Sequence, residues 1–196
     1  MMRNDVTVYF IRHGQTDWNA SRRYQGQRDI PLNAKGRAQA RRNGLTLARL
    51  LPAIEAADFV SSPLGRARET MEIVRAAMSL DPAQYRIEDK IKEIHYGHWE
   101  GQLAKDIPTQ DPGGLAERRL DPFHWRPRGG ESYADLTARI KPWLDHLDRD
   151  AVVASHGGVG RTLQGIVLDL EHAEILTLEA PQDRIMVLRH RDISWL

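Results

Sequence analysis

The sequence contains no cysteine among its 196 residues. Disulfides and Cys-based metal centres are therefore excluded, and a reducing compartment is permitted. No apolar run approaches the roughly 20 residues that a membrane-spanning helix requires. Residues 1–5 also lack the long apolar core of a signal peptide. We therefore expect a cytoplasmic protein with no membrane partner.

An excess of charge of one sign is also missing. The 28 Lys and Arg residues nearly balance the 27 Asp and Glu residues, which leaves a formal net charge of +1. Charge therefore gives no reason to expect a nucleic-acid partner. The apolar content of 41% is ordinary for a globular protein. The length suits a single domain over residues 1–196, and the sequence does not indicate an oligomeric state.

Short apolar runs alternate with amphipathic stretches along the chain. This alternation predicts an α/β fold with a mainly parallel central sheet, in which ligands bind beyond the carboxyl ends of the strands. The predicted strands are 6–11, 58–61, 85–87, 151–155, 174–178 and 184–189. The predicted helices are 34–51 (ended by Pro52), one that opens at 62–63, 132–148 and 159–170.

Capping residues mark several of the predicted helix starts. Asn33 is suited to cap the helix over 34–51. Ser62 and Pro63 are typical of a cap followed by a first helical residue. Ser132 begins a capping box. Pro142 lies inside the predicted helix over 132–148 and predicts a kink or a broken turn there.

Proline and glycine are concentrated between residues 101 and 130. A stretch of this length in a compact domain is usually functional or disordered. We expect a long crossover or lid here, with one short helix over 115–120. Four of its residues could contact a substrate's leaving group or could equally pack on the rim of a site: His124, Trp125, Arg126 and Arg128.

Two of the predicted strands end in the same way. One runs into Arg12-His13-Gly14, and the other runs into His156-Gly157-Gly158. Parallel neighbours would place both imidazoles at one edge of the sheet, where glycines let the backbone approach a ligand closely. The helix that follows Gly158 would point N–H groups and the positive end of its dipole at the same edge. Such a site favours an anion.

Arg66 supports the same conclusion. It lies in the first turn of the helix that opens at Ser62, where the helix dipole disfavours a cation by about 0.3–1 kcal/mol. An anion bound between the helix start and Arg66 would remove the conflict. Together with Arg12 it would supply two planar guanidinium groups, which suit a tetrahedral phosphate.

Each residue alone has a simpler interpretation. One His-Gly pair after a strand is usually an ordinary turn, and Arg12 alone could be a surface charge. Two histidines could bind a metal, but the carboxylates near them form no recognisable ligand set, so we expect neither a metal nor a cofactor. His95 and His98 lie in an irregular segment and are interpreted as local hydrogen-bonding or cleft residues.

Taken together, these segments resemble the signature of the histidine phosphatase superfamily, which has the phosphoglycerate mutase-like fold. The resemblance spans nearly the whole chain in the family's order, and the combination of motifs is highly specific. The matching positions are 12–19, 23–26, 29–32, 36, 39–40, 61–67, 93, 97–101, 129–132 and 155–158. The resemblance implies a three-layer αβα sandwich with a mainly parallel central sheet.

The resemblance implies that His13 is a nucleophile that forms a phosphohistidine. Neutral imidazole can attack near pH 7 without an activating base, because its reference pKa is about 6.5. A cationic cage without metal can stabilise phosphoryl transfer, which depends mainly on positioning and charge. The residues implied to hold the phosphoryl oxygens are Arg12, Asn19, Arg66 and His156.

The resemblance also implies that Glu93 protonates the leaving alkoxide and then activates water. To carry a proton near neutral pH, this carboxyl group needs burial or a nearby anionic substrate. Glu88 and Asp89 are weaker candidates for the acid, and Glu100 is assigned to structure. The residues further expected to contact substrate are Gln25, Gly26 and Gly157.

The favoured function is a metal-independent, histidine acid phosphatase-type phosphomonoesterase that acts on a small phosphorylated metabolite. A cofactor-dependent phosphoglycerate mutase is the first alternative. The family's true mutases are generally longer, and residues 129–132 resemble the phosphatase branches. A non-catalytic phosphoryl-binding protein is the second alternative. Such proteins usually lack a catalytic residue, whereas none of the six key positions is lost here.

Overall fold

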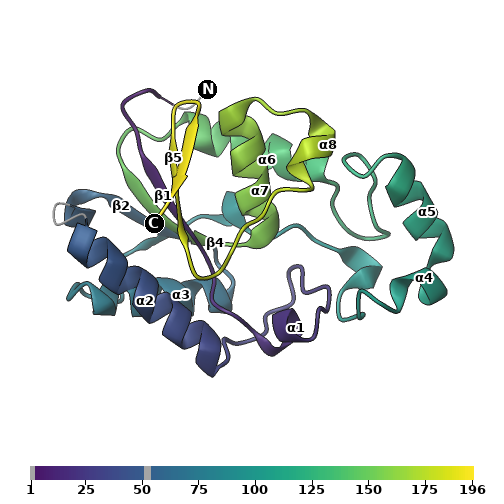
Figure 1. Ribbon diagram of the computed structural model, residues 1–196, viewed down its shortest axis with the longest axis horizontal. Coiled ribbons are helices and arrows are strands. Elements are labelled where there is room, and N and C mark those ends of the chain that lie inside the picture. Colours follow the sequence, from purple (N-terminus) through teal and green to yellow (C-terminus); the bar gives the residue numbers. More distant parts are fainter. Residues whose placement is uncertain (1–2, 51–53) are drawn as a thin grey trace.

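A six-stranded sheet with the strand order β3-β2-β4-β1-β5-β6 forms the centre of the protein (Figure 1). The computed structural model describes residues 3–50 and 54–196. The four strands from β3 to β1 are parallel, and β5 and β6 add an antiparallel edge. The strands are β1 (Val8–Arg12), β2 (Asp58–Ser61), β3 (Arg86–Ile87), β4 (Ala151–Ser155), β5 (Ile185–Arg189) and β6 (Asp192–Trp195).

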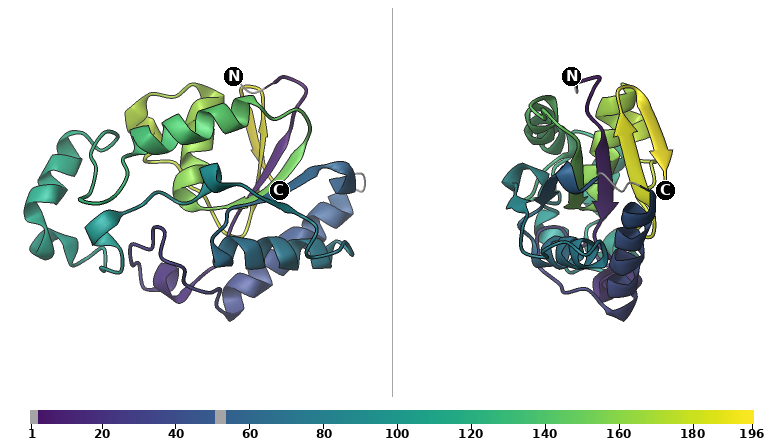
Figure 2. Two further views of the ribbon diagram at one scale, coloured as in Figure 1. Left: turned by 180° about the vertical axis from the view of Figure 1, so that it is seen from behind. Right: turned by 90° about the vertical axis from the view of Figure 1, so that its left-hand side faces the viewer.

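Helices cover both faces of this sheet, so the expected three-layer α/β architecture is confirmed (Figure 2). The helices are α1 (Asp17–Ala20), α2 (Ala34–Leu50), α3 (Gly65–Ala77), α4 (Ile107–Gln110), α5 (Pro112–Leu120), α6 (Tyr133–Asp145), α7 (Gly157–Leu168) and α8 (His172–Ile175). Short 3-10 turns occupy Ile54–Ala56, Asp89–Ile91 and Gly97–Trp99.

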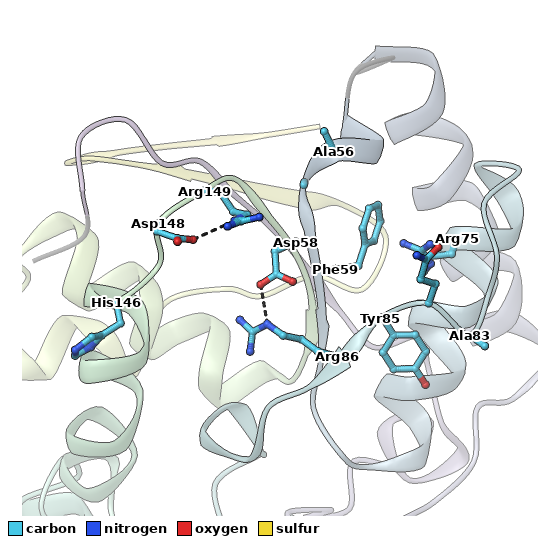
Figure 3. A pocket seen from close by; sticks show the side chains of 12 residues that line it. Ala56, Asp58, Phe59, Arg75, Ala83, Tyr85, Arg86, His146, Asp148 and Arg149 are labelled. Atoms are coloured by element: carbon cyan, nitrogen blue, oxygen red, sulfur yellow. Dashed lines mark hydrogen bonds and ion pairs between the residues drawn. The ribbon is translucent and has the colours of Figure 1, made fainter.

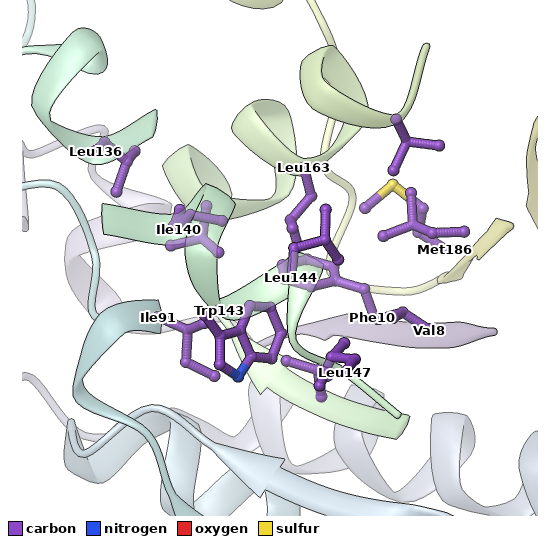
Figure 4. Close-up of a cluster of buried hydrophobic side chains, with 14 of the residues drawn as sticks. Val8, Phe10, Ile91, Leu136, Ile140, Trp143, Leu144, Leu147, Leu163 and Met186 are labelled. Carbon is purple, nitrogen blue, oxygen red and sulfur yellow. The ribbon is translucent and has the colours of Figure 1, made fainter. Parts of the chain in front are cut away.

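The period-2 alternation of β1 divides the core into two layers. Val8 and Phe10 face the cluster that contains the apolar stripes of α6 and α7, which include Ile140 (Figure 4). Tyr9 and Ile11 face the opposite cluster, formed with α2 and α3. Burial on both faces explains why this strand reads as a continuous apolar run.

The register of the two central strands determines where the candidate site lies. Arg12 at the end of β1 is paired with Ser155 at the end of β4. Because the strands are parallel, His13 and His156 leave the sheet next to each other at its carboxyl edge. The backbone N–H of His13 donates to the Ser155 carbonyl (2.8 Å), which continues the ladder to this point.

Two of the predicted caps are confirmed. The Asn33 side chain accepts from the N–H of Gly36 (2.9 Å) at the start of α2. Ser132 forms a capping box with Asp135 at the start of α6, and this helix continues through Pro142 without breaking. The predicted end of the first helix, at 51–52, lies outside the described residues.

Other local predictions are wrong. Residues 174–178, predicted as a strand, contain the end of α8, because Glu174 closes a capping box with Glu171. The predicted Ser62 cap is also wrong, since α3 begins at Gly65. The sequence interpretation also missed β6 and α1, whose start is capped by Thr16.

The segment over 101–130 forms two short helices, α4 and α5, where one was expected. Both project from the body of the sheet, away from α2 and α3 (Figure 1). The segment is held by a fully buried Trp99, whose ring lies 4.5 Å from that of Trp125, with the Arg118 guanidinium 5.4 Å from the Trp99 ring. Aromatic and cation–π contacts therefore attach this projection to the rest of the fold.

Candidate active site

His13 is held in one orientation and one tautomer by its neighbours. Its Nδ1 lies 2.8 Å from the carbonyl oxygen of Gly14, so Nδ1 must carry the proton and donate. The opposite nitrogen, Nε2, accepts a hydrogen bond from Arg66 Nε at 3.2 Å. His13 therefore presents the lone pair of Nε2 toward the guanidinium of Arg66.

The charge state of His13 follows from its surroundings. The side chain is almost completely buried. Burial first, and then the nearby Arg66 and Arg12 guanidinium groups, hold the pKa of His13 well below its usual value of 6.5. The imidazole is therefore neutral at pH 7, which is the form that can act as a nucleophile.

Arg66 is fixed by hydrogen bonds to four neighbouring residues. Its terminal nitrogens donate to the carbonyl oxygens of Arg28 (2.7 Å) and Gly26 (2.6 Å), and its Nε donates to His13. The Gln25 amide is best satisfied with its oxygen toward Arg66, at 2.7 and 3.1 Å from two guanidinium nitrogens. Burial lowers the pKa of Arg66 to about 10, so the group stays charged at neutral pH.

His156 lies beside His13, with 5.1 Å between the ring centroids. Its Nε2 is 2.7 Å from the Ser62 hydroxyl, and its buried Nδ1 has no hydrogen-bond partner within residues 3–50 and 54–196. Burial, followed by the charge of Arg66, lowers the pKa of His156 well below 6.5. Ser62 therefore orients this imidazole, although the sequence had assigned the serine to a helix cap.

Glu93 reaches the same edge of the sheet and is 8% exposed. Its carboxylate accepts from the backbone N–H of Gly158 (3.1 and 3.2 Å) in the first turn of α7, and from that of Ile94 (3.0 Å). A Cβ atom at position 158 would lie 2.5 Å from Glu93 Oε1. The absence of a side chain at Gly158 therefore allows this carboxylate to approach the helix.

Arg12 lies beside Gly157 at the start of α7. One terminal nitrogen donates to the Ala180 carbonyl (2.8 Å), and its buried Nε has no partner among the described residues. Burial lowers the pKa of Arg12 below its usual value. A Cβ atom at Gly157 would lie 3.3 Å from the guanidinium carbon, so this glycine packs against Arg12.

Asn19 is connected to His13 through Gln182, which lies outside the predicted strands and helices. Gln182 Nε2 donates to the His13 carbonyl oxygen (3.0 Å) and to Asn19 Oδ1 (3.0 Å). The N–H of Thr16 donates to the same oxygen. With its oxygen occupied, Asn19 can contact a ligand through its amide nitrogen. No local sequence pattern marked Gln182, because its partners lie far away in the chain.

The start of α3 differs from the prediction. Asp29 accepts from the N–H of Gly65 (2.7 Å) and of Arg66 (3.4 Å), and its carboxylate lies 3.7 Å from the Arg66 guanidinium. The negative charge that the sequence predicted at this helix start is therefore present in the protein itself. Gln25 and Gly26, predicted to contact substrate, are in contact with Arg66.

Three of the four residues of the 101–130 segment that were left open have side-chain partners within the protein, and among them Trp125 packs on Trp99 as described above. His124 contacts Asp121, and Arg126 forms an ion pair with Asp135 (2.6 Å). His98 Nε2 is 2.8 Å from Asp111, while His95 Nδ1 accepts from the N–H of Gly97. The hydrogen bonds of these two histidines agree with the local role expected for them.

A cavity of about 740 Å³ lies at the opposite, amino ends of the strands (Figure 3). It is lined in part by Asp58, Phe59, Arg75 and Arg86, and the Asp58–Arg86 ion pair (2.7 Å) crosses it. None of the predicted site residues lines this cavity. Within residues 3–50 and 54–196, no group of three or more His, Asp or Glu side chains could hold a metal ion. No helix of that part is long and apolar enough to cross a membrane.

Comparisons with known sequences identify one family. The family model described as "Histidine phosphatase superfamily (branch 1)" matches residues 8–196. A glucosyl-3-phosphoglycerate phosphatase of Mycobacterium tuberculosis is 34% identical over 176 residues, which cover 83% of this chain and 75% of the relative. A probable phosphoglycerate mutase of Salmonella paratyphi C is 32% identical over 194 residues, which cover 96% of this chain and 83% of the relative.

Solved structures show the same relationship. A mycobacterial glucosyl-3-phosphoglycerate phosphatase in complex with VO3 superposes with a TM-score of 0.78 at 32% identity, over 97% of this chain and 96% of the other. A putative alpha-ribazole-5'-P phosphatase from Escherichia coli superposes with a TM-score of 0.79 at 23% identity, over 98% and 95%. At that identity the second likeness shows the shared fold alone.

Proposed function

Because the chain belongs to the histidine phosphatase superfamily and is a phosphatase of that type, we propose that it is a metal-independent phosphomonoesterase that works through a phosphohistidine at His13. The proposal rests on the protonation state of this imidazole: Nδ1 donates to the Gly14 carbonyl, and Nε2 keeps a lone pair beside Arg66. The nucleophile thus needs no activating base.

In the first step, His13 Nε2 attacks the phosphorus of the substrate. A nitrogen–phosphorus bond forms, and the bond between phosphorus and the leaving oxygen breaks. Glu93, in its protonated form, transfers its proton to that oxygen, so the alcohol leaves neutral. The Gly158 and Ile94 N–H groups hold the carboxyl group in place for this transfer.

In the second step, a water molecule replaces the alcohol. Glu93, now a carboxylate, takes a proton from this water as its oxygen attacks the phosphorus. The nitrogen–phosphorus bond breaks, inorganic phosphate forms, and His13 returns to its neutral state. Splitting one displacement into two lowers the barrier that each step has to cross.

The phosphoryl oxygens require a positively charged cage. Arg66 and Arg12 supply guanidinium groups near His13, and the amide of Asn19 supplies a neutral donor. The Ser62 hydroxyl lies where it can donate to His156 Nε2, which leaves the unpartnered Nδ1 as the donor toward a phosphoryl oxygen. These roles need no group beyond the chain's own side chains.

The substrate in this proposal is a small phosphorylated metabolite. Residues 101–130, with α4 and α5, would act as the lid of the single domain and select the leaving group. Both the phosphatase and the mutase relatives are consistent with the first step, so a phosphoglycerate mutase is kept as the alternative. A location in the cytoplasm remains a prediction from the sequence.

The proposal is tested by assaying the protein on p-nitrophenyl phosphate and a panel of sugar and glycerate phosphates in the presence of EDTA. We expect release of inorganic phosphate without added bisphosphoglycerate, and an acid-labile phosphoenzyme that is absent from His13→Ala. Interconversion of glycerate phosphates without release would identify a mutase. Labelling that persists in His13→Ala would contradict the assignment of the nucleophile, and activity lost in EDTA but restored by a divalent metal would contradict metal independence.

A further inference from the structure

We propose that Glu131 and Arg139 are positioning residues for Glu93: their ion pair holds the backbone on both sides of the general acid. This inference rests on the role proposed for Glu93 above. Among the described residues, their hydrogen bonds reach the backbone of Glu93 but not the side chain of a predicted site residue, and neither carries an expected role in the chemistry. Their contacts converge on the short segment that carries the acid.

The two side chains form a two-point ion pair. Arg139 Nε donates to Glu131 Oε1 at 2.9 Å, and a terminal nitrogen of the same guanidinium donates to Oε2 at 3.1 Å. Both side chains are mostly buried, with 21% and 25% of their surface exposed. The hydrogen bonds from Arg139 hold the pKa of Glu131 below its usual value although burial opposes the shift, so the pair is ionised at neutral pH.

The pair binds the backbone before and after the acid. Arg139 donates to the carbonyl oxygens of Lys90 (2.5 Å) and Glu93 (3.1 Å), and Glu131 Oε2 accepts from the N–H of His95 (2.9 Å). Gln27 adds a second donor to the Glu93 carbonyl at 3.0 Å. The peptide units around Glu93 are thus fixed by three side chains from two separate segments, the loop that holds Gln27 and the segment from Glu131 to Arg139.

The Glu131–Arg139 ion pair links, through Glu93, two helices, α6 and α7, that already pack together. Arg139 belongs to α6, and Glu131 directly precedes its capping residue, Ser132. The carboxylate of Glu93 is held by the start of α7, which packs against α6 in the same hydrophobic cluster. The backbone of Glu93 is therefore tied to one helix and its carboxylate to the other. A small displacement of α6 would move the acid away from the leaving oxygen.

The pair has an alternative, purely structural role, in which it only anchors residues 90–95 to α6. The two roles differ in how they depend on the leaving group. A nitrophenolate leaves without a proton, whereas the alkoxide of a sugar or glycerol phosphate needs one. The quantity kcat/KM reports the steps up to formation of the phosphoenzyme, so it isolates the proton donated to the leaving oxygen from later hydrolysis.

The test compares kcat/KM for p-nitrophenyl phosphate and for glycerol phosphate in Arg139→Gln and Glu131→Gln. We expect a loss of about 10–100-fold on glycerol phosphate and less than about 3-fold on p-nitrophenyl phosphate, since general acid catalysis contributes roughly 10²–10⁴-fold. Adding Arg139→Gln to a Glu93→Gln background should produce almost no further loss on glycerol phosphate, because the group being positioned is already gone.

Arg86→Gln is the matched control, because it breaks a partly exposed Arg–Asp ion pair in the cavity of Figure 3, at the opposite ends of the strands. Arg86→Gln should leave kcat/KM unchanged on both p-nitrophenyl phosphate and glycerol phosphate. Equal losses on both substrates, or losses that add fully to Glu93→Gln, would overturn the positioning role. If neither variant folds, Gln27→Ala removes one of the two donors to the Glu93 carbonyl. An unchanged kcat/KM on glycerol phosphate in Gln27→Ala would also overturn the positioning role. Absence of phosphatase activity in the unmodified protein would instead refute the proposed function.

Discussion

A serine or cysteine nucleophile needs an activating base, whereas at His13 a backbone carbonyl selects the tautomer whose Nε2 lone pair is free of a proton. The Gly14 carbonyl determines which nitrogen carries the proton, and the Arg66 guanidinium marks where the lone pair points. In the proposed mechanism the same arginine also supplies charge for the phosphoryl group. One side chain would then both lower the pKa of His13 and bind the substrate.

A substitution at Gly158 can test whether the position of Glu93, the proposed general acid, matters. The substitution Gly158→Ala introduces a Cβ 2.5 Å from Glu93 Oε1 and must displace the carboxylate. We expect a loss of kcat/KM on an alkyl phosphate of about 10–100-fold, within the range of general acid catalysis. Because alanine is a better helix former than glycine, the urea midpoint should fall only slightly.

The matched control is Gly113→Ala in α5, where a new Cβ meets no atom within 4 Å. It should retain the activity of the unmodified protein. A Gly158→Ala enzyme with full activity on alkyl phosphates would show that the approach of Glu93 to α7 is not required.

At the scale of the element, α3 begins without a cap from its own sequence. The residue at its N-cap position, Leu64, makes no side-chain bond, and the carboxylate of Asp29 takes over from a distant loop. This arrangement couples the loop over 25–29 to the helix that carries Arg66. The same loop supplies the Gly26 and Arg28 carbonyls that hold the guanidinium.

Removing this cap should affect stability and activity together. For Asp29→Ala we expect a loss of about 1 kcal/mol in the free energy of unfolding, as for other N-cap deletions, and a lower kcat because Arg66 loses its alignment. Urea denaturation and steady-state kinetics measure the two effects. Asp106→Ala is the control, since Asp106 precedes α4 without making a capping bond. Equal effects of the two substitutions would contradict the coupling.

Much of each element, but little of its long-range support, could be predicted from the sequence. The runs that became β1 and β4 and the caps at Asn33 and Ser132 were predictable because their causes are local: apolar continuity and a side chain three residues from its partner. The contacts of Asp29 with α3 depend on the tertiary fold, so no local pattern revealed them. The strand predicted over residues 174–178 failed for a different, local reason, because the apolar alternation there competes with a capping box between Glu171 and Glu174.

At the scale of the whole molecule, two neutral imidazoles are buried together beside arginines. His13 and His156 both have a pKa well below 6.5 in the folded protein. The unfolded chain, in contrast, takes up a proton on each as the pH falls through about 6.5. Below that value the unfolded state binds more protons than the folded state, so acid favours unfolding.

The free energy of unfolding should therefore decrease as the pH is lowered from 6.5 toward 5, by up to about 1.4 kcal/mol per pH unit for each of the two histidines. Urea denaturation at a series of pH values measures this slope. The variants His13→Asn and His156→Asn should each remove one proton's share of it. A slope unchanged in both variants would show that these imidazoles are not the groups responsible.

The pairing of β1 with β4 has a consequence for how the protein acquires its site. The two strands that deliver His13 and His156 are separated by most of the chain, and β5 then closes the other side of β1. Contacts between residues so far apart in the sequence form slowly, because the entropy of closing a long loop is lost before the contacts contribute any stabilisation. Helices can form locally and early, but the proposed phosphate cage can assemble only once the last strands have docked. Recovery of activity during refolding is therefore a measure of completed topology, and it will lag behind recovery of helix.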